Sequence, residues 1–237
     1  MKRSVFVSYI ILIALVAGRG FTEETGGVVI SSYATSVADQ EQAVKTNIRL
    51  ASVKLNGVEI PSGEVFSFNR TVGEGSAANG YLSGRVLYQD RAAYEAGGGI
   101  CQVSSTLYNA LLLAGCIIIE RHRHAYPVTY VPLGLDATIR YGKKDLRMKN
   151  PHNRPLYIST SMNGSSLLVT VRSGGELNES YEVYTEEESV NIPFDENSGR
   201  RIKPGATIYV YRKKIANGRP AESALLYKDF YPPVYAE

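Results

Sequence analysis

The sequence contains no tryptophan and only two cysteines, three histidines and three methionines in 237 residues. Two cysteines are too few for a disulfide scaffold, and so few thiols and imidazoles leave little material for a structural metal site. The chain also lacks an excess of either charge, since 26 Lys and Arg face 23 Asp and Glu. This balance argues against a nucleic-acid-binding protein, which would carry a clustered basic excess.

Apolar and turn-forming residues are plentiful. Hydrophobic residues make up 44% of the chain and charged residues 21%, which is enough apolar material for a buried core and excludes a disordered chain. The 17 tyrosines, 22 glycines and 10 prolines favour strands and turns over a helical bundle. The length fits one elaborated domain or two small ones.

The first twenty residues have the pattern of an export signal. Lys2 and Arg3 precede an apolar run over residues 5–17, which residues 18–20 end with Gly, Arg and Gly. The run is shorter than the roughly 20 residues of a relaxed membrane span. It therefore predicts a cleaved signal peptide or, alternatively, an uncleaved anchor in the membrane, with the rest of the protein outside the cytoplasm. Residues 21–36, rich in Gly, Ser and Thr, predict a linker.

Hydrophobic periodicity predicts an α+β fold in which a central helix packs on a mostly antiparallel sheet. The spacing of apolar residues predicts helices over 39–55 and 101–114. We expect one domain over 37–172 and a β-rich extension over 173–237 that is continuous with it. Strands are expected at 65–68, 85–89, 116–119, 128–131, 136–141, 146–149, 156–160, 167–172, 181–184, 207–212 and 225–228, and a turn at 216–218.

The two cysteines stand at opposite ends of the predicted central helix and cannot pair within the chain. The ends of such a helix lie about 22 Å apart, far beyond the reach of a disulfide. Cys116 follows three leucines, an alanine and a glycine and precedes three isoleucines, so we interpret it as a small buried hydrophobe in a buried strand.

Cys101 has different surroundings, because three glycines precede it and a polar run follows it. Glycines allow close backbone approach, and a thiol at a helix N-terminus loses its proton more easily. The pattern predicts a nucleophile, with backbone N–H groups near Cys101 and Gln102 as an oxyanion site. A cysteine buried at a tight loop is the alternative. We expect substrate contacts from Gly98, Gly99, Gln102, Ser104 and Ser105.

A thiolate that transfers acyl groups needs a base within hydrogen-bond reach and a group to orient that base. Histidine suits the role of base, and His122 and His124 would face the same side of an extended segment. His152 follows Asn150 and Pro151 and is expected to be a turn residue. Asp136, expected to open a strand, is the natural orienting group, although an exposed aspartate is an equal alternative.

A zinc site is the competing interpretation, since Cys101, His122 and His124 could supply three ligands. Two histidines at this spacing are common in strands that bind no metal. We therefore predict neither a metal nor another cofactor.

Several segments together resemble the VanW family. The stretch around Cys101 carries most of the resemblance, and the family's histidine before its Pro-Val segment corresponds to His124. The segments that carry it are 65–69, 80–81, 97–109, 127–132 and 136–138, with an ending at 227–234 that looks like the family's.

The resemblance implies an exported protein that acts at the cell wall or the outer face of the cytoplasmic membrane. It further implies a cysteine-dependent acyltransferase of the L,D-transpeptidase kind on peptidoglycan stem peptides, with Cys101 as nucleophile, His124 as base and Asp136 as orienter. A non-catalytic accessory protein that binds peptidoglycan or a glycopeptide drug is the alternative. The acceptor, a stem amine or water, stays open.

Overall fold

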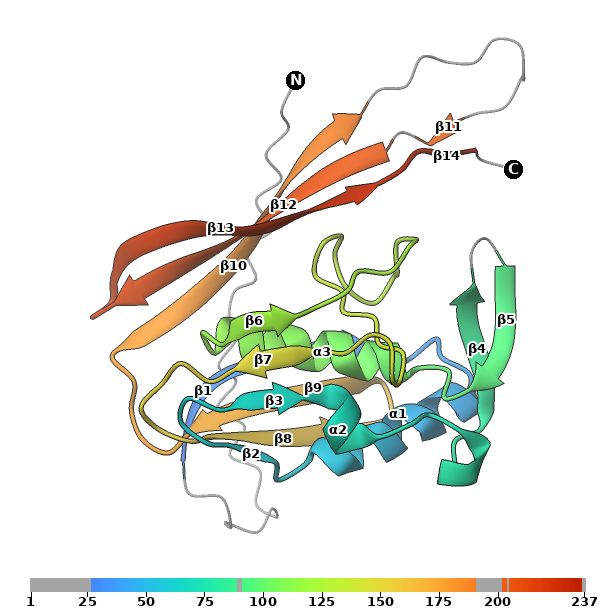
Figure 1. Ribbon diagram of the computed structural model, residues 1–237, viewed down its shortest axis with the longest axis horizontal. Helices are drawn as coiled ribbons and strands as arrows, with labels where there is room; N and C mark the ends of the chain where they lie inside the picture. The colour runs from blue at the N-terminus through green and yellow to red at the C-terminus, as the bar shows by residue number, and fades with distance from the viewer. Residues whose placement is uncertain (1–26, 89–90, 191–201, 204, 236–237) are drawn as a thin grey trace.

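The computed structural model describes residues 27–88, 91–190, 202–203 and 205–235. Within these residues the chain forms helices packed on antiparallel sheets, which confirms the predicted α+β fold (Figure 1). The helices are α1 (Gln42–Leu55), α2 (Phe68–Val72) and α3 (Ile100–Leu113), with a short 3₁₀ helix at Ala77–Asn79. The predicted export segment over 1–20 lies outside the described residues.

A four-stranded sheet packs on one side of α3. Its order is β1-β9-β8-β2, and its strands are β1 (Val28–Ser36), β9 (Ser166–Ser173), β8 (Leu156–Met162) and β2 (Glu59–Ile60). The linker prediction is therefore wrong over 28–36, because these residues pair with β9 along their whole length. Ser31 and Thr35 of β1 are buried, and their hydroxyls form hydrogen bonds with α3. The polar residues of this segment therefore reflect its contact with the helix and not a linker.

A second, three-stranded sheet lies on the other side of α3, as Figure 1 shows. Its order is β3-β7-β6, with β3 (Val65–Ser67), β7 (Arg147–Lys149) and β6 (Ile117–Glu120). The prediction of a buried strand here is wrong, since Ile117 and Ile119 on β6 are 43% and 45% exposed. Cys116, immediately before β6, is fully buried as expected.

Helix α3 is the centre of the main hydrophobic core. Almost all of its side chains are buried, and apolar residues of α1 and both sheets pack around them. A β-hairpin of β4 (Ser83–Tyr88) and β5 (Arg91–Ala96) stands beside the N-terminal end of α3. The structure thus places the start of α3 at the edge of the core, next to a projecting hairpin.

The C-terminal region forms a long three-stranded sheet of order β10-β12-β13 that crosses the loop side of the main body (Figure 1). The strands are β10 (Glu179–Val190), β12 (Gly205–Ala216) and β13 (Arg219–Tyr231), and the predicted turn over 216–218 joins the last two. Two short strands, β11 (Ile202–Lys203) and β14 (Val234–Tyr235), pair beside them. A smaller core cluster packs this sheet against the loop over residues 121–145. Its members are Leu135, Ala206, Ile208, Val210 and Tyr231.

A long loop over 121–145 replaces two expected strands. No strand forms at 128–131 or 136–141, where the structure has only the isolated bridge between Arg140 and Lys144. Hydrogen bonds of side chains, rather than pairing between strands, hold this loop, as described below.

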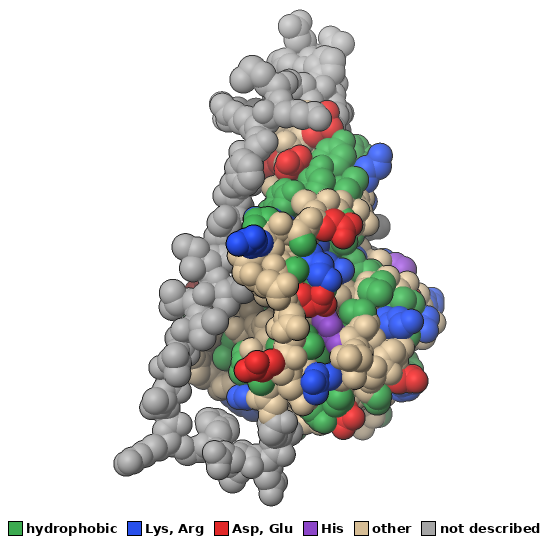
Figure 2. Space-filling view, turned by 90° about the vertical axis from the view of Figure 1, so that its left-hand side faces the viewer, with side chains coloured by type: hydrophobic (Ala, Val, Ile, Leu, Met, Phe, Trp, Pro, Cys, Tyr) green, Lys and Arg blue, Asp and Glu red, His purple; other side chains and the backbone are tan. Residues whose placement is uncertain are grey.

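On the face seen in Figure 2, basic and acidic side chains are interspersed. In the described part of the chain, no helix has the length and apolar character needed to cross a membrane.

Candidate functional site

Cys101 lies in the first turn of α3, directly after the three glycines. Gly99 adopts φ +103°, and a Cβ atom there would lie 2.8 Å from a methyl carbon of Val44 on α1. A Cβ atom on Gly98 would lie 2.6 Å from the backbone of Gly84 on β4. Neither contact is sterically possible, so the loop needs glycine to bring the helix start against α1 and the hairpin. Gly98 and Gly99 therefore have a packing role, and their expected contact with substrate stays a prediction.

The thiol of Cys101 is half-buried and lies against the 121–145 loop. Its Sγ atom is 3.5 Å from Oγ1 of Thr138 and 3.7 Å from the carbonyl oxygen of Ile139. The side chain of His124 is close enough to this thiol to lower its pKa. The structure thus brings the expected nucleophile and the expected base together.

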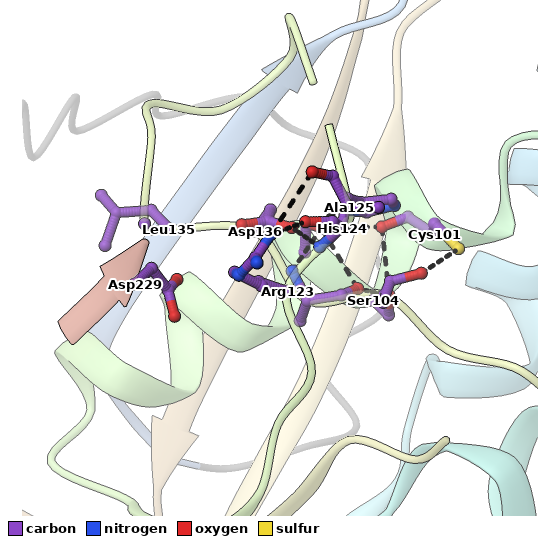
Figure 3. Close-up of polar contacts among 12 residues, drawn as sticks. Cys101, Ser104, Arg123, His124, Ala125, Leu135, Asp136 and Asp229 are labelled. Carbon is purple, nitrogen blue, oxygen red and sulfur yellow. Dashed lines mark hydrogen bonds and ion pairs between the residues drawn. The ribbon is translucent and has the colours of Figure 1, made fainter. Parts of the chain in front are cut away.

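His124 lies between Cys101 and Asp136 (Figure 3). Its Nδ1 atom is 2.6 Å from Oδ2 of Asp136, and its backbone N–H donates to the same oxygen at 2.6 Å. Since Asp136 takes Nδ1, the Nε2 atom is left to face the thiol. The aspartate is 2% exposed, so the alternative of an exposed strand-end residue is wrong. It sits in the loop, not at the start of a strand.

Mutual charge stabilises the ionised forms of these three groups. Burial raises the pKa of the Cys101 thiol, but the hydrogen bond and charge of His124 outweigh it, and the pKa lies below the ordinary value. Burial lowers the pKa of His124, but the bonds to Asp136 and Cys101 raise it to about 9. Burial likewise opposes ionisation of Asp136, yet His124 and Arg121 hold its pKa low. The lowered pKa of the thiol and the raised pKa of the imidazole both favour a thiolate paired with an imidazolium.

Arg121 holds the far side of Asp136, a contact that the sequence analysis missed. Its Nη2 atom is 3.0 Å from Oδ1 of Asp136, and its Nε donates to the Asp136 carbonyl oxygen at 2.7 Å. Its Nη1 atom is 2.6 Å from Oδ2 of Asp229 on β13, and the hydroxyl of Tyr231 donates to Oδ1 of Asp136 at 3.2 Å. The resemblance of residues 227–234 to the family's ending was the one sequence signal near these partners.

Gln102 is buried and holds β1 in place. Its Nε2 atom donates to Thr35 and to the carbonyl oxygen of Ser36, and its Oε1 atom accepts from Gln40. Its backbone N–H donates to the carbonyl oxygen of Gly99 at 3.0 Å. The expected roles of Gln102 in substrate contact and in an oxyanion site do not fit these bonds, because both its donors are already used.

Ser104 and Ser105 fix the loop to the helix. The hydroxyl of Ser104 donates to the carbonyl oxygen of Ala137, whereas that of Ser105 donates to the carbonyl oxygen of Cys101 at 2.8 Å and accepts from the Ala137 N–H at 2.9 Å. Both side chains are fully buried. These serines therefore position the residue next to Asp136, and the predicted contact with substrate does not fit their burial.

The other two histidines lie apart from this cluster. His122 bonds Glu120 at 2.9 Å through Nε2 and is partly exposed. His152 lies in a bend, as expected of a turn residue, but its side chain is buried and its Nε2 lies 2.8 Å from the carbonyl oxygen of Ala114. Among the described residues, no group of three or more His, Cys, Asp or Glu side chains is arranged to hold a metal ion, and His122 does not join Cys101 and His124 as the zinc interpretation requires.

The fold and the site define an α+β protein with a Cys–His–Asp cluster at the start of its central helix. The family model described as VanW like protein matches residues 43–172, more than half of the chain. The chain therefore belongs to the VanW-like family, as its resemblance predicted.

Two curated relatives support this membership. The chain is 36% identical over 149 residues to the uncharacterized protein YoaR of Bacillus subtilis, which covers 63% of this chain and 49% of YoaR. It is 35% identical over 109 residues to the vancomycin B-type resistance protein VanW of Enterococcus faecalis, covering 44% of this chain and 40% of that protein. The chain thus spans half or less of the length of each relative. No solved structure matches it significantly.

Proposed function

We propose that this protein is an extracytoplasmic thiol acyltransferase that acts on the stem peptides of peptidoglycan. The observation that carries the proposal is the Cys101 thiol beside His124, which lowers the pKa of the thiol and whose Nδ1 atom lies 2.6 Å from Oδ2 of Asp136. A nucleophile, a base and an orienting group in this order is the arrangement that nucleophilic acyl transfer requires.

In the first half-reaction, the Cys101 sulfur attacks the carbonyl carbon of a stem-peptide bond. The C–N bond breaks, the Nε2 proton of His124 passes to the leaving amine, and a thioester forms on Cys101. In the second half-reaction, an amine of another stem or a water molecule attacks the thioester. Its proton returns to His124 as the thiolate leaves, which restores the starting state. Asp136 stays ionised throughout and keeps the ring oriented.

The choice of peptidoglycan rests on kinship and on the export pattern of residues 1–20. The related E. faecalis protein is named for resistance to vancomycin. The basic start and the apolar run of this chain would place its domain outside the cytoplasm, where it would meet the cell wall. Both observations favour a cell-wall substrate over other peptides.

The test is to incubate the purified protein with a disaccharide-tetrapeptide and to follow the products by mass spectrometry. We expect cross-linked dimers or a shortened stem, and a thioester on Cys101. Cys101→Ala should abolish turnover. His124→Ala should lower it by about 100-fold or more, whereas the matched His122→Ala variant should retain most activity because the His122 side chain bonds to Glu120, away from Cys101. Turnover that survives Cys101→Ala would rule out the proposed reaction.

A non-catalytic accessory that binds peptidoglycan or a glycopeptide is the second candidate. Two observations favour it: the related E. faecalis protein is named for vancomycin resistance, and the side chains of Gln102, Ser104 and Ser105 all bond within the protein. Binding of stem peptide by wild type and Cys101→Ala alike, without any product, would favour this function.

A further inference from the structure

Asp229 is a buried carboxylate that the proposed reaction does not use. It lies on β13, outside the segment 43–172 that the family model matches, and it is 8% exposed. Its ion pair with Arg121 measures 2.6 Å, and the two side chains are 10% and 5% exposed. Burying a pair of charges is costly and often contributes nothing to stability, so a pair at this place calls for another explanation.

We propose that Asp229 is a positioning residue of the Cys101 site: by taking up the charge of Arg121, it leaves the carboxylate of Asp136 free to hold His124 as an imidazolium. The inference rests on the proposed function for its catalytic consequence. The C-terminal sheet then contributes to the site, because β13 supplies the negative charge of Asp229 from outside the segment 43–172 that the family model matches.

The argument begins with how the two cations share the two carboxylates. Asp136 accepts from His124 at Oδ2 and from Arg121 at Oδ1. If Asp229 were absent, the guanidinium of Arg121 and the imidazolium of His124 would compete for the one negative charge of Asp136. Because histidine holds its proton more weakly than arginine, His124 would be the first to lose its proton. With Asp229 bonded to Nη1, each cation has a carboxylate of its own.

Aromatic rings shield the guanidinium of Arg121 and strengthen this sharing. Its Cζ atom lies 4.7 Å from the ring centroid of Tyr227 and 5.7 Å from that of Tyr108. Charges act over a longer range where water is excluded. The two bonds from Arg121 to Asp136 and Asp229 are therefore the main routes by which its charge is balanced.

The remaining groups around His124 supply no equivalent carboxylate within the described chain. Cys101 faces it from α3 as the thiolate partner, and Tyr130 faces it from the loop with ring centroids 6.4 Å apart. Arg123, the preceding residue, packs over the ring of Tyr231, whose hydroxyl donates to Asp136. Asp229 is thus the one carboxylate besides Asp136 that bonds this cluster.

The experiment follows the imidazole protons of His124 by NMR across pH 5 to 11 in the full chain, with the resonance assigned by its loss in His124→Gln. We expect Asp229→Asn to lower the pKa of His124 by about 1 unit. The matched control is Lys228→Gln, which removes one charge from an exposed neighbour on the same strand and should leave the pKa unchanged. An unchanged pKa in Asp229→Asn would overturn the inference.

A double variant tests whether Asp229 acts through Arg121. Arg121→Gln combined with Asp229→Asn removes both charges, leaves no unpaired ion and so tolerates burial better than the single change. We expect the pKa of His124 to return to the wild-type value. A pKa as low as in Asp229→Asn would show that Asp229 does not act through Arg121. If Asp229→Asn fails to fold, a lowered pKa in the double variant still contradicts the inference.

Turnover separates this inference from the proposed function. If wild type is active, the alkaline limb of its pH–rate profile should move down by about 1 unit in Asp229→Asn and stay in place in Lys228→Gln. A merely structural role would lower stability without moving that limb. If wild type shows no turnover but the pKa shift is found, the proposed function fails and the charge-sharing role of Asp229 stands.

Discussion

At the scale of single residues, the two cysteines differ in each property that governs thiol reactivity. Cys101 is half-buried and paired with an imidazolium, which lowers its pKa. Cys116 is fully buried among aliphatic side chains, and burial raises its pKa to about 12 despite the charge of Arg212 nearby. Since the thiolate is the reactive form, Cys101, with its lowered pKa and partial exposure, should be the more reactive of the two thiols.

We therefore predict that iodoacetamide modifies Cys101 at pH 7 and leaves Cys116 unmodified in the folded protein. Peptide mass spectrometry at timed intervals measures both rates. His124→Ala should slow modification of Cys101, because it removes the charge that lowers the thiol pKa, and should leave Cys116 unaffected. Equal, slow labelling of both thiols in wild type would contradict the lowered pKa.

At the level of single residues, the sequence predicted the reactive groups of the site but missed the residues that hold them in place. Cys101 stood out by its glycines and His124 by the family resemblance, and in the structure His124 lies between Cys101 and Asp136. Arg121 was missed because strict alternation along an extended segment turned it away from the histidines, whereas the chain leaves β6 at Glu120 and enters the loop. Asp229 was missed because 108 positions separate it from Arg121, a distance that no local pattern bridges.

At the scale of elements, the start of α3 depends on glycine at position 99, and this can be measured. Gly99 combines φ +103° with a Cβ position 2.8 Å from Val44 and 3.0 Å from Ile48. Gly57 is the matched control, since its φ is +83° and nothing lies within 4 Å of its Cβ position. Gly57→Ala should lower the free energy of unfolding by about 1 kcal/mol through backbone strain alone.

Gly99→Ala should lower the free energy of unfolding by at least about 2 kcal/mol, because the added methyl also overlaps the α1 side chains. Urea unfolding followed by circular dichroism gives both values. The displaced helix start should also slow alkylation of Cys101, an effect that Gly57→Ala lacks. Equal losses of stability in the two variants would show that the loop can shift away from α1.

Helices with a regular spacing of apolar residues could be predicted from the sequence. Segments whose conformation depends on hydrogen bonds to side chains could not. The amphipathic periods of α1 and α3 gave both helices within a few residues. The segment 28–36 was misread because Ser31 and Thr35 are polar, although both are buried against α3. The 136–141 segment alternates like a strand, but its backbone bonds go to helix hydroxyls such as Ser105 and to the His122 carbonyl.

At the scale of the whole molecule, the Cys101–His124 pair should set part of the dependence of stability on pH. The pKa of His124 is raised from 6.5 to about 9, so its contribution is complete below pH 6.5 and is lost as pH rises through about 9. The pKa of Cys101 is lowered from 9.0, so its contribution is present above pH 9 and is lost as pH falls through the folded value. Between 6.5 and 9 the two trends oppose each other.

Proton counting turns this opposition into a prediction. Above the lowered pKa of Cys101 and below the pKa of about 9 of His124, the folded pair holds one proton, as imidazolium with thiolate. Between pH 6.5 and 9 the unfolded pair also holds one proton, as imidazole with thiol. The pair thus gives wild type no slope in this window. In Cys101→Ala, Asp136 still raises the pKa of His124, so the folded state holds a proton that the unfolded state lacks.

The free energy of unfolding of Cys101→Ala should therefore fall relative to wild type as pH rises through the window, by at most about 1.4 kcal/mol per pH unit. Urea unfolding of both proteins at several pH values between 6 and 9.5 measures the difference and cancels the titration of groups that they share. Adding His124→Gln to the variant should remove the slope. A difference that stays constant over this range would mean that Asp136 does not raise the pKa of His124 once the Cys101 thiol is removed.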